Sequence, residues 1–238
     1  MPDYKAPLRD IQFVLNDLLE AEKHYASLQG CETVTPDLMD AIIREGAKFA
    51  ENIVNPIAAD GDQIGCRFEA GKVTTPPGFK EAYQQWADGG WQGLSIAAQD
   101  GGQGLPGSLS TVIGEMAGAP SWAFTMYGGL ALAPVTCLIN GGTEEQKQRY
   151  IPKILSGEWA GTMCLTEAHC GSDVGLLKTK ASANADGTYT LQGTKIFISG
   201  GEQDITRNII HAILARVEGA PEGTKGVSLF IAPKYWVN

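Results

Sequence analysis

The sequence predicts an α+β protein in which a helical first part is followed by a β-rich second part. Apolar residues recur at helical spacing through about the first two-thirds of the chain. From Trp159 onward the pattern changes to the short alternating and apolar runs that are typical of strands. We therefore expect a helical domain over residues 1–158 and a β domain over residues 159–238.

The first helical segments are predicted from periodicity and from capping residues. One apolar stripe is expected from five residues, namely Leu8, Ile11, Leu15, Leu18 and Leu19. A second helix should begin with Thr35 as its N-cap and Pro36 in its first turn. We expect this helix to end at Asn55-Pro56, because a proline disfavours helical backbone at the residue before it.

Two glycine-rich stretches follow a short helix that is predicted over residues 79–86. Residues 89–94 and 101–106 have the composition of a phosphate-binding loop, so that alternative has to be weighed. Neither stretch follows a clear strand, and neither contains the GxxxxGK[ST] or GxGxxG order that phosphate loops use. We interpret both as structural turns.

Residues 116–139 carry no charge and are long enough to cross a bilayer. The stretch also contains two prolines, three glycines and several hydroxyl side chains. This composition favours a pair of helices buried in a protein core, and we expect no stable membrane span. Thr143 and Gln146 then have the spacing of a capping box for a helix that should end near Leu155.

The β region should contain about five strand segments. Residues 179–185 and 188–199 are strand-like and are joined by Asp186-Gly187, a strong hairpin-turn signal. Residues 209–217 and 227–231 add two apolar strands. Because the last strand ends only a few residues before Asn238 and a sheet needs closed or covered edges, we expect the chain to stop inside a β domain.

Composition excludes several classes of function. Hydrophobic residues make up 43% of the 238-residue chain, as in a globular protein with a sizeable core. The net charge of −9 argues against binding to nucleic acid, which needs concentrated Lys and Arg. Five cysteines without a CxxC pair indicate reduced thiols, and three histidines without ligand spacing argue against a metal site. With no apolar signal core at the N-terminus, we expect a cytoplasmic protein.

Residues 163–173 are the most informative stretch for chemistry. A strand leads into a loop where Thr166, Gly171 and Ser172 offer backbone N–H groups or hydroxyls. Such a loop could hydrogen-bond the edge of a flat heteroaromatic ring or bind phosphate oxygens. Taken alone, it could equally be a polar strand-to-loop junction whose hydroxyls satisfy the nearby backbone.

The motif order resembles that of the acyl-CoA dehydrogenase family. Residues 166–173, T-E-A-H-C-G-S-D, resemble the TEPxxGSD signature, and residues 193–201, G-T-K-I-F-I-S-G-G, resemble the G-x-K-x-[WFY]-I-[ST]-x-G block. The stretches 90–94, 101–106 and 142–147 match the family too. The N-terminal sequence resembles a branch with long chains that includes dehydrogenases of methylthiopropanoyl-CoA and of longer fatty acyl-CoAs.

The resemblance implies an N-terminal helical domain, an incomplete middle antiparallel β-barrel and FAD as cofactor. By position, Met163, Leu165 and Thr166 would line the flavin edge, and Phe197 would cover its face. The remaining cofactor contacts would come from Gly171, Ser172, Ile198 and Ser199. Ser172 matches a position that contacts the cofactor phosphates or the acyl-CoA pantetheine, so it is also a substrate candidate.

The resemblance further implies a flavin-dependent α,β-dehydrogenation of an acyl-CoA to the trans-2-enoyl-CoA. The catalytic base of the family is a glutamate of the C-terminal helical domain, which we expect beyond Asn238. This chain alone should therefore be inactive and hold FAD weakly. An electron-transfer flavoprotein is the implied electron acceptor, and a homo-oligomer is implied at full length. Two alternatives remain open, an acyl-CoA oxidase of the same fold and a non-catalytic subunit that binds acyl-CoA or flavin.

Five residues depart from the family pattern. Ala168, His169 and Cys170 stand where the family often has a proline and small residues. His169 could contact substrate, but a partly exposed loop histidine is the interpretation that its surroundings favour. Cys170 is expected to be a small packed residue, since no base is placed by sequence to activate it. Ser199 and Glu202 differ between branches of the family, so the acyl chain of the substrate is not predicted.

Overall fold

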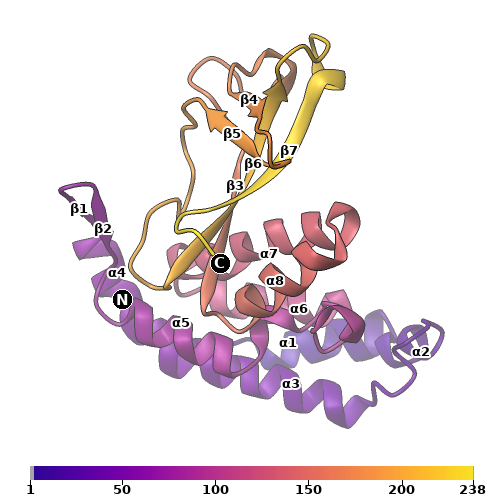
Figure 1. Cartoon of the computed structure of the whole chain (residues 1–238). Coiled ribbons are helices and arrows are strands. Elements are labelled where there is room, and N and C mark those ends of the chain that lie inside the picture. Colours follow the sequence, from indigo (N-terminus) through magenta and orange to yellow (C-terminus); the bar gives the residue numbers. More distant parts are fainter. Residues whose placement is uncertain (1–2, 238) are drawn as a thin grey trace.

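A curled sheet stands on a body of helices in the computed structural model, which describes residues 3–237 (Figure 1). The eight α-helices of these residues are α1 (Leu8–Gln12), α2 (Ala21–Ala26), α3 (Pro36–Phe49), α4 (Asn55–Ile64), α5 (Phe79–Asp88), α6 (Gly107–Gly118), α7 (Trp122–Gly141) and α8 (Glu144–Leu155). The strands are β1 (Arg67–Glu69), β2 (Lys72–Thr74), β3 (Trp159–Cys164), β4 (Lys180–Ala183), β5 (Tyr189–Gln192), β6 (Asn208–Val217) and β7 (Val227–Pro233). This order confirms the α+β class.

Two helix starts lie where the sequence placed them. Thr35 caps α3 by accepting a hydrogen bond from the Leu38 N–H at 3.3 Å, and Pro36 occupies the first turn. Thr143 and Gln146 form the predicted capping box of α8, which ends at Leu155. Both signals are local, because the capping side chain and the N–H that it satisfies are three residues apart.

The predicted stop at Pro56 is wrong. A π-helical segment, Ala50–Val54, follows α3, and the chain then continues as α4 to Ile64. Pro56 lies within this continuous helical run, directly after the π-helical segment, and a π-helical turn is a known way for a helix to pass an interruption of its hydrogen bonds. Gly65, at φ +65°, ends the helix instead.

The predicted apolar stripe of the first helix holds only in part. Ile11 and Leu15 are buried, but Leu18 and Leu19 are exposed by 66% and 59%. The chain forms a π-helical segment over Phe13–Leu18, and its wider turn rotates the later leucines away from the core.

Residues 116–139 were expected to form a pair of helices, but only residues 116–118 belong to α6 and a single helix, α7, runs through Pro134 and covers residues 122–139. By length and composition alone, α7 is the one helix within residues 3–237 that could cross a membrane. Ala131, Val135 and Leu138 of α7 pack in a buried cluster with α8, Trp159 of β3 and Ile210 of β6. This cluster joins the sheet to the helices.

The main sheet is built around β6, the longest strand. β7 pairs antiparallel with one side of β6, while β3 and then β4 pair parallel with its other side, and β5 follows β4. The sheet is therefore mixed and not purely antiparallel as expected. The long connection from β3 to β6, residues 165–207, allows the chain to return and run in the same direction.

One local agreement and two local differences complete the comparison with the sequence. The hairpin turn at Asp186-Gly187 joins β4 to β5 as predicted. The strand expected over 188–199 ends at Gln192, and the rest is a loop. The β1–β2 hairpin was not predicted, because each strand has only three residues and all but one of those residues are exposed.

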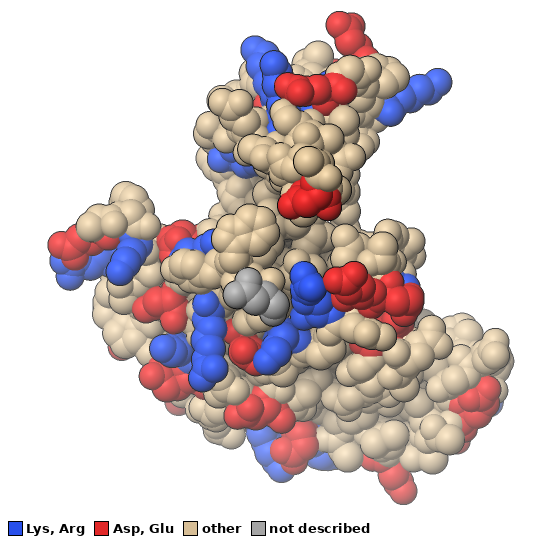
Figure 2. All heavy atoms as spheres, in the orientation of Figure 1, with Lys and Arg blue, Asp and Glu red and all other residues tan. Residues whose placement is uncertain are grey.

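On the face drawn in Figure 2, acidic and basic side chains are interspersed.

Gly161 brings β3 against α7 at a close approach. A Cβ atom added at Gly161 would lie 2.4 Å from the Pro134 Cγ and 2.9 Å from the Ala131 carbonyl oxygen. Neither a proline ring nor a helical carbonyl can rotate out of the way, so a side chain here would push the sheet off the helix.

We expect Gly161→Ala to lower the free energy of unfolding by about 1–3 kcal/mol, the usual cost of overpacking. Gly129→Ala is the matched control on α7, since an added Cβ there meets nothing within 4 Å. That change should raise the free energy of unfolding by about 0.5–1 kcal/mol, because alanine is the better helix former. Urea unfolding of both variants measures the difference, and equal midpoints would contradict the packing argument.

Candidate functional site

The two stretches that resemble cofactor motifs lie side by side at the end of β3. The Ile196 N–H donates to the Thr166 carbonyl oxygen at 2.9 Å. The Lys195 ammonium donates to the Leu165 carbonyl oxygen at 3.0 Å. Gly171 also lies close, because a Cβ added there would be 3.5 Å from Thr166 Cγ2. Segments some thirty residues apart in sequence thus form one surface.

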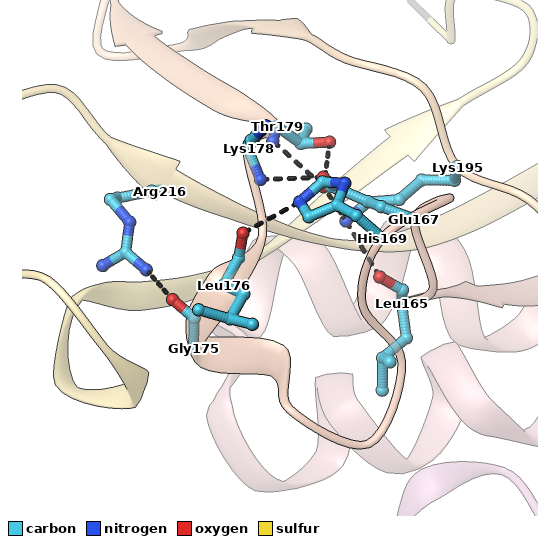
Figure 3. Close-up of polar contacts among 9 residues, drawn as sticks. All are labelled: Leu165, Glu167, His169, Gly175, Leu176, Lys178, Thr179, Lys195 and Arg216. Atoms are coloured by element: carbon cyan, nitrogen blue, oxygen red, sulfur yellow. Dashed lines mark hydrogen bonds and ion pairs between the residues drawn. The ribbon is translucent and has the colours of Figure 1, made fainter.

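Glu167 is the centre of the hydrogen bonds at this place (Figure 3). Its Oε1 accepts from the Thr179 N–H at 3.0 Å, the Thr179 hydroxyl at 2.6 Å and the Lys195 ammonium at 2.9 Å. Its Oε2 accepts from the Lys178 N–H at 2.7 Å. Only 4% of the Glu167 side chain and 9% of the Lys195 side chain are exposed. The carboxylate is therefore buried, paired and fully hydrogen-bonded.

The environment of Glu167 fixes its charge. Burial by itself raises the pKa of a carboxyl group, but the hydrogen bonds from Thr179, Lys178 and Lys195 outweigh it and lower the pKa from 4.5 to about 2. Glu167 is consequently ionised at any physiological pH.

Glu167, His169 and Cys170 each offer one metal-ligating atom, and these atoms lie within 4.8 Å of one another. The donor set is nevertheless a poor one for a divalent cation. Both Glu167 oxygens already accept hydrogen bonds, and the Lys195 charge lies 2.9 Å from one of them. The His169 Nε2 is 3.0 Å from the Leu176 carbonyl oxygen, to which it donates. A metal would have to displace these contacts.

Phe197 follows the anchored residues Lys195 and Ile196 and points outward. Its ring is 89% exposed, and its backbone has φ +58°, a left-handed conformation that non-glycine residues rarely adopt. A turn closes just after it, where the Gly201 N–H donates to the Ile198 carbonyl oxygen at 3.0 Å. Gly200 in this turn approaches Tyr127 of α7. The loop therefore presents a large aromatic face at the edge of the sheet.

The structure brings five of the eight predicted cofactor residues close to one another: Leu165, Thr166 and Gly171 on one segment, and Phe197 and Ile198 beside Ile196 on the other. Met163 lies half-buried within β3, and Ser199 lies exposed in the turn after Phe197. Ser172 is exposed farther along the first loop, beyond the turn that Cys170 closes with Glu167. Cys170 is buried and His169 is partly exposed, as the sequence suggested.

Sequence reasoning missed three residues of this site. Lys195 and Glu167 stood only as letters of the two motifs, and Thr179 only as the start of a predicted strand. The available signal was that a glutamate and a lysine both stand inside motifs that should meet around a cofactor.

Comparison with known proteins gives a consistent result. Residues 38–158 match the acyl-CoA dehydrogenase N-terminal domain and residues 162–235 match the acyl-CoA dehydrogenase middle domain. A 3-methylmercaptopropionyl-CoA dehydrogenase of Ruegeria pomeroyi is 39% identical over 97% of this chain, and the chain spans 39% of that protein's length. This similarity agrees with the predicted branch.

Two solved structures share the fold. An acyl-CoA dehydrogenase of Bacillus anthracis, complexed with FAD, has a TM-score of 0.67 at 24% identity and is covered over 31% of its chain. A structure described as an electron transferring flavoprotein of Acidaminococcus fermentans has a TM-score of 0.68 at 25% identity and is covered over 48%. Each comparison covers 84% of this chain.

Acid should weaken the fold through Glu167. Because its pKa falls from 4.5 to about 2 on folding, its contribution to stability is present above pH 4.5 and is lost as the pH falls toward 2. We expect this group to account for about 3 kcal/mol of the drop in unfolding free energy over that window.

Glu167→Gln should lack this part of the drop when urea unfolding is measured at a series of acidic pH values. Glu158→Gln, which alters an ion pair with Lys153 at the surface, is the control and should keep it. An unchanged pH slope in the Glu167 variant would contradict the assignment.

Proposed function

Because the chain belongs to the acyl-CoA dehydrogenase family, we propose that it binds FAD at the end of β3 and serves the α,β-dehydrogenation of an acyl-CoA thioester. The residues proposed to hold the cofactor are Met163, Leu165, Thr166, Gly171, Ser172, Phe197, Ile198 and Ser199. Ser172 is proposed to contact the acyl-CoA as well.

The observation that carries this proposal is the exposed ring of Phe197. A phenylalanine that is 89% exposed gains little from burial in the chain itself, yet its backbone is held in a costly conformation. A flat heteroaromatic ligand would cover this face and bury it. Thr166, half-buried beside the loop, offers a hydroxyl at the edge of the same surface. The residues present therefore fit a flavin ring.

Bound FAD would supply hydride acceptance from the β-carbon of the thioester. The chain's own contribution is to orient the flavin and to exclude water from the site. Hydroxyl and backbone N–H donors that are fixed before binding stabilise negative charge better than mobile water does. The Phe197 ring provides an apolar wall on one side of such a site.

The two glutamates of the site are poorly suited to be the base that removes the α-proton. A general base works best with a pKa near the operating pH, whereas Glu167 has a pKa of about 2 and four hydrogen bonds. Glu202, which directly follows the Phe197 loop (residues 193–201), is paired with the Lys234 ammonium at 2.6 Å. We propose that the base comes from outside the sequence given.

Substrate and electron acceptor follow from the relatives. The Ruegeria pomeroyi relative is named for 3-methylmercaptopropionyl-CoA, and we propose an acyl-CoA thioester as the substrate class here. We propose an electron-transfer flavoprotein as the acceptor, because the acyl-CoA dehydrogenase family to which the chain belongs implies one. An acyl-CoA oxidase would instead pass its electrons to oxygen, and oxygen consumption separates the two.

Phe197→Ala should weaken FAD binding about tenfold or more, since stacking on an aromatic face is worth about 1–3 kcal/mol in comparable complexes. Thermal stability should stay within the range of a surface substitution, because the ring is exposed. Phe68→Ala on the β1–β2 hairpin is the matched control, with a ring that is 72% exposed and remote in sequence. Flavin fluorescence titration measures both, and equal affinities would count against the site.

The 238-residue chain should show no appreciable turnover of butyryl-CoA or 3-methylmercaptopropionyl-CoA with FAD and an artificial electron acceptor. The physical reason is that Glu167 has a pKa of about 2 and that the Glu202 carboxylate is paired with the Lys234 ammonium, so both are poorly suited to remove the α-proton. A steady-state assay tests this, with a full-length relative as positive control. Measurable turnover would show that the chain supplies its own base.

A further inference from the structure

The buried pair formed by Glu167 and Lys195 connects parts of the chain that no strand pairing connects. Glu167 lies just after β3, and Lys195 lies in the loop after β5. We propose that this pair is the positioning contact that holds the Phe197 loop, residues 193–201, on the end of β3, and that FAD affinity depends on it. The statement about FAD affinity rests on the proposed function, whereas the statement that the pair holds the loop does not.

Lys195 can be replaced without removing the other hydrogen bonds to Glu167. Of the four hydrogen bonds that Glu167 accepts, three come from Thr179 and Lys178, which belong to the segment leading into β4. The fourth comes from Lys195, which is thus the one residue of these three that belongs to the Phe197 loop. Removing the Lys195 ammonium therefore releases the loop while most of the support for Glu167 remains.

The ammonium makes two contacts at once, and both hold the loop to the same place. It donates to Glu167 Oε1 at 2.9 Å and to the Leu165 carbonyl oxygen at 3.0 Å. The next residue along, Ile196, adds its N–H bond to the Thr166 carbonyl oxygen at 2.9 Å. Three bonds thus connect Lys195 and Ile196 to residues 165–167. Hydrogen bonds that involve a charged group are the stronger class, so the Lys195 bonds should dominate.

Phe197 itself contributes little to holding the loop. Its ring is 89% exposed and its left-handed backbone carries a conformational cost. The next anchor along the chain is Glu202, whose carboxylate accepts from the Lys234 ammonium at 2.6 Å. Asp204 follows, and its carboxylate accepts from the Thr75 N–H at 2.9 Å and the Thr75 hydroxyl at 2.8 Å. Between Ile196 and Glu202 the loop passes through glycines and the turn at Gly201. Phe197 directly follows Ile196 and is separated from Glu202 by this turn, so its orientation is set from the Lys195 side.

Lys195→Gln tests the inference, with Lys153→Gln as the matched control. Lys153 pairs with Glu158 at 2.6 Å on the surface and lies outside the loop. Hydrogen exchange of the Ile196 amide reports how firmly the loop is held, without any cofactor. FAD affinity from fluorescence titration, and the visible circular dichroism of any bound flavin, report the consequence for the cofactor.

We expect Lys195→Gln to speed exchange of the Ile196 amide and to weaken FAD binding, each by about tenfold or more, since bonds to charged groups are worth at least that factor. The circular dichroism of bound flavin should change, and Lys153→Gln should leave all three readings unaltered. Lys195→Arg keeps the positive charge and the hydrogen-bond donors, so it should restore the exchange rate, the FAD affinity and the circular dichroism at least in part. Glu167→Gln tests the contact from its other side if Lys195→Gln does not fold.

Two results would overturn the inference. The Ile196 amide could exchange at the same rate in Lys195→Gln as in Lys153→Gln, which would mean that the pair does not hold the loop. Alternatively, exchange could be faster with FAD affinity unchanged, which would mean that the loop's position does not matter to the cofactor. Absence of FAD binding by the unsubstituted chain, with exchange altered as expected, would instead contradict the proposed function and leave the positioning contact in place.

Discussion

The buried carboxylate of Glu167 has to be satisfied wherever the chain places it, and this requirement shapes the whole site. An unpaired carboxylate in that position would be far too costly to keep ionised. Four donors from the segment before β4 and from the loop after β5 meet this need. The consequence is that two loops far apart in sequence are held against the end of one strand, where a cofactor surface can form.

The sheet makes this meeting geometrically possible. β3 and β4 pair with the same side of β6, one after the other, so the end of β3 and the start of β4 lie close together. β5 pairs back on β4, and the chain after it returns past the end of β3. The cluster of Ile210 with α7 and α8 fixes this sheet on the helices. Binding residues on loops are thus carried by a rigid frame, as is common for ligand sites.

The sequence could predict those features whose causes lie within a few residues. The cap at Thr35, the capping box at Thr143 and the turn at Asp186-Gly187 are of this kind, and all three were found. The π-helical segment before Pro56 and the parallel pairing of β3 depend on distant packing, which periodicity does not record. The same holds for the contact between Lys195 and Glu167. Family resemblance located the two motifs, but only the fold shows which side chain joins them.

A crystal structure of the chain with FAD would test the central claim most directly. The account predicts that the flavin ring lies against Phe197, with the Lys195 ammonium still bonded to Glu167 and to the Leu165 carbonyl oxygen. A flavin bound elsewhere on the chain would contradict the assignment of the site. A Lys195 side chain turned away from Glu167 toward the cofactor would contradict the idea that the buried pair holds the loop.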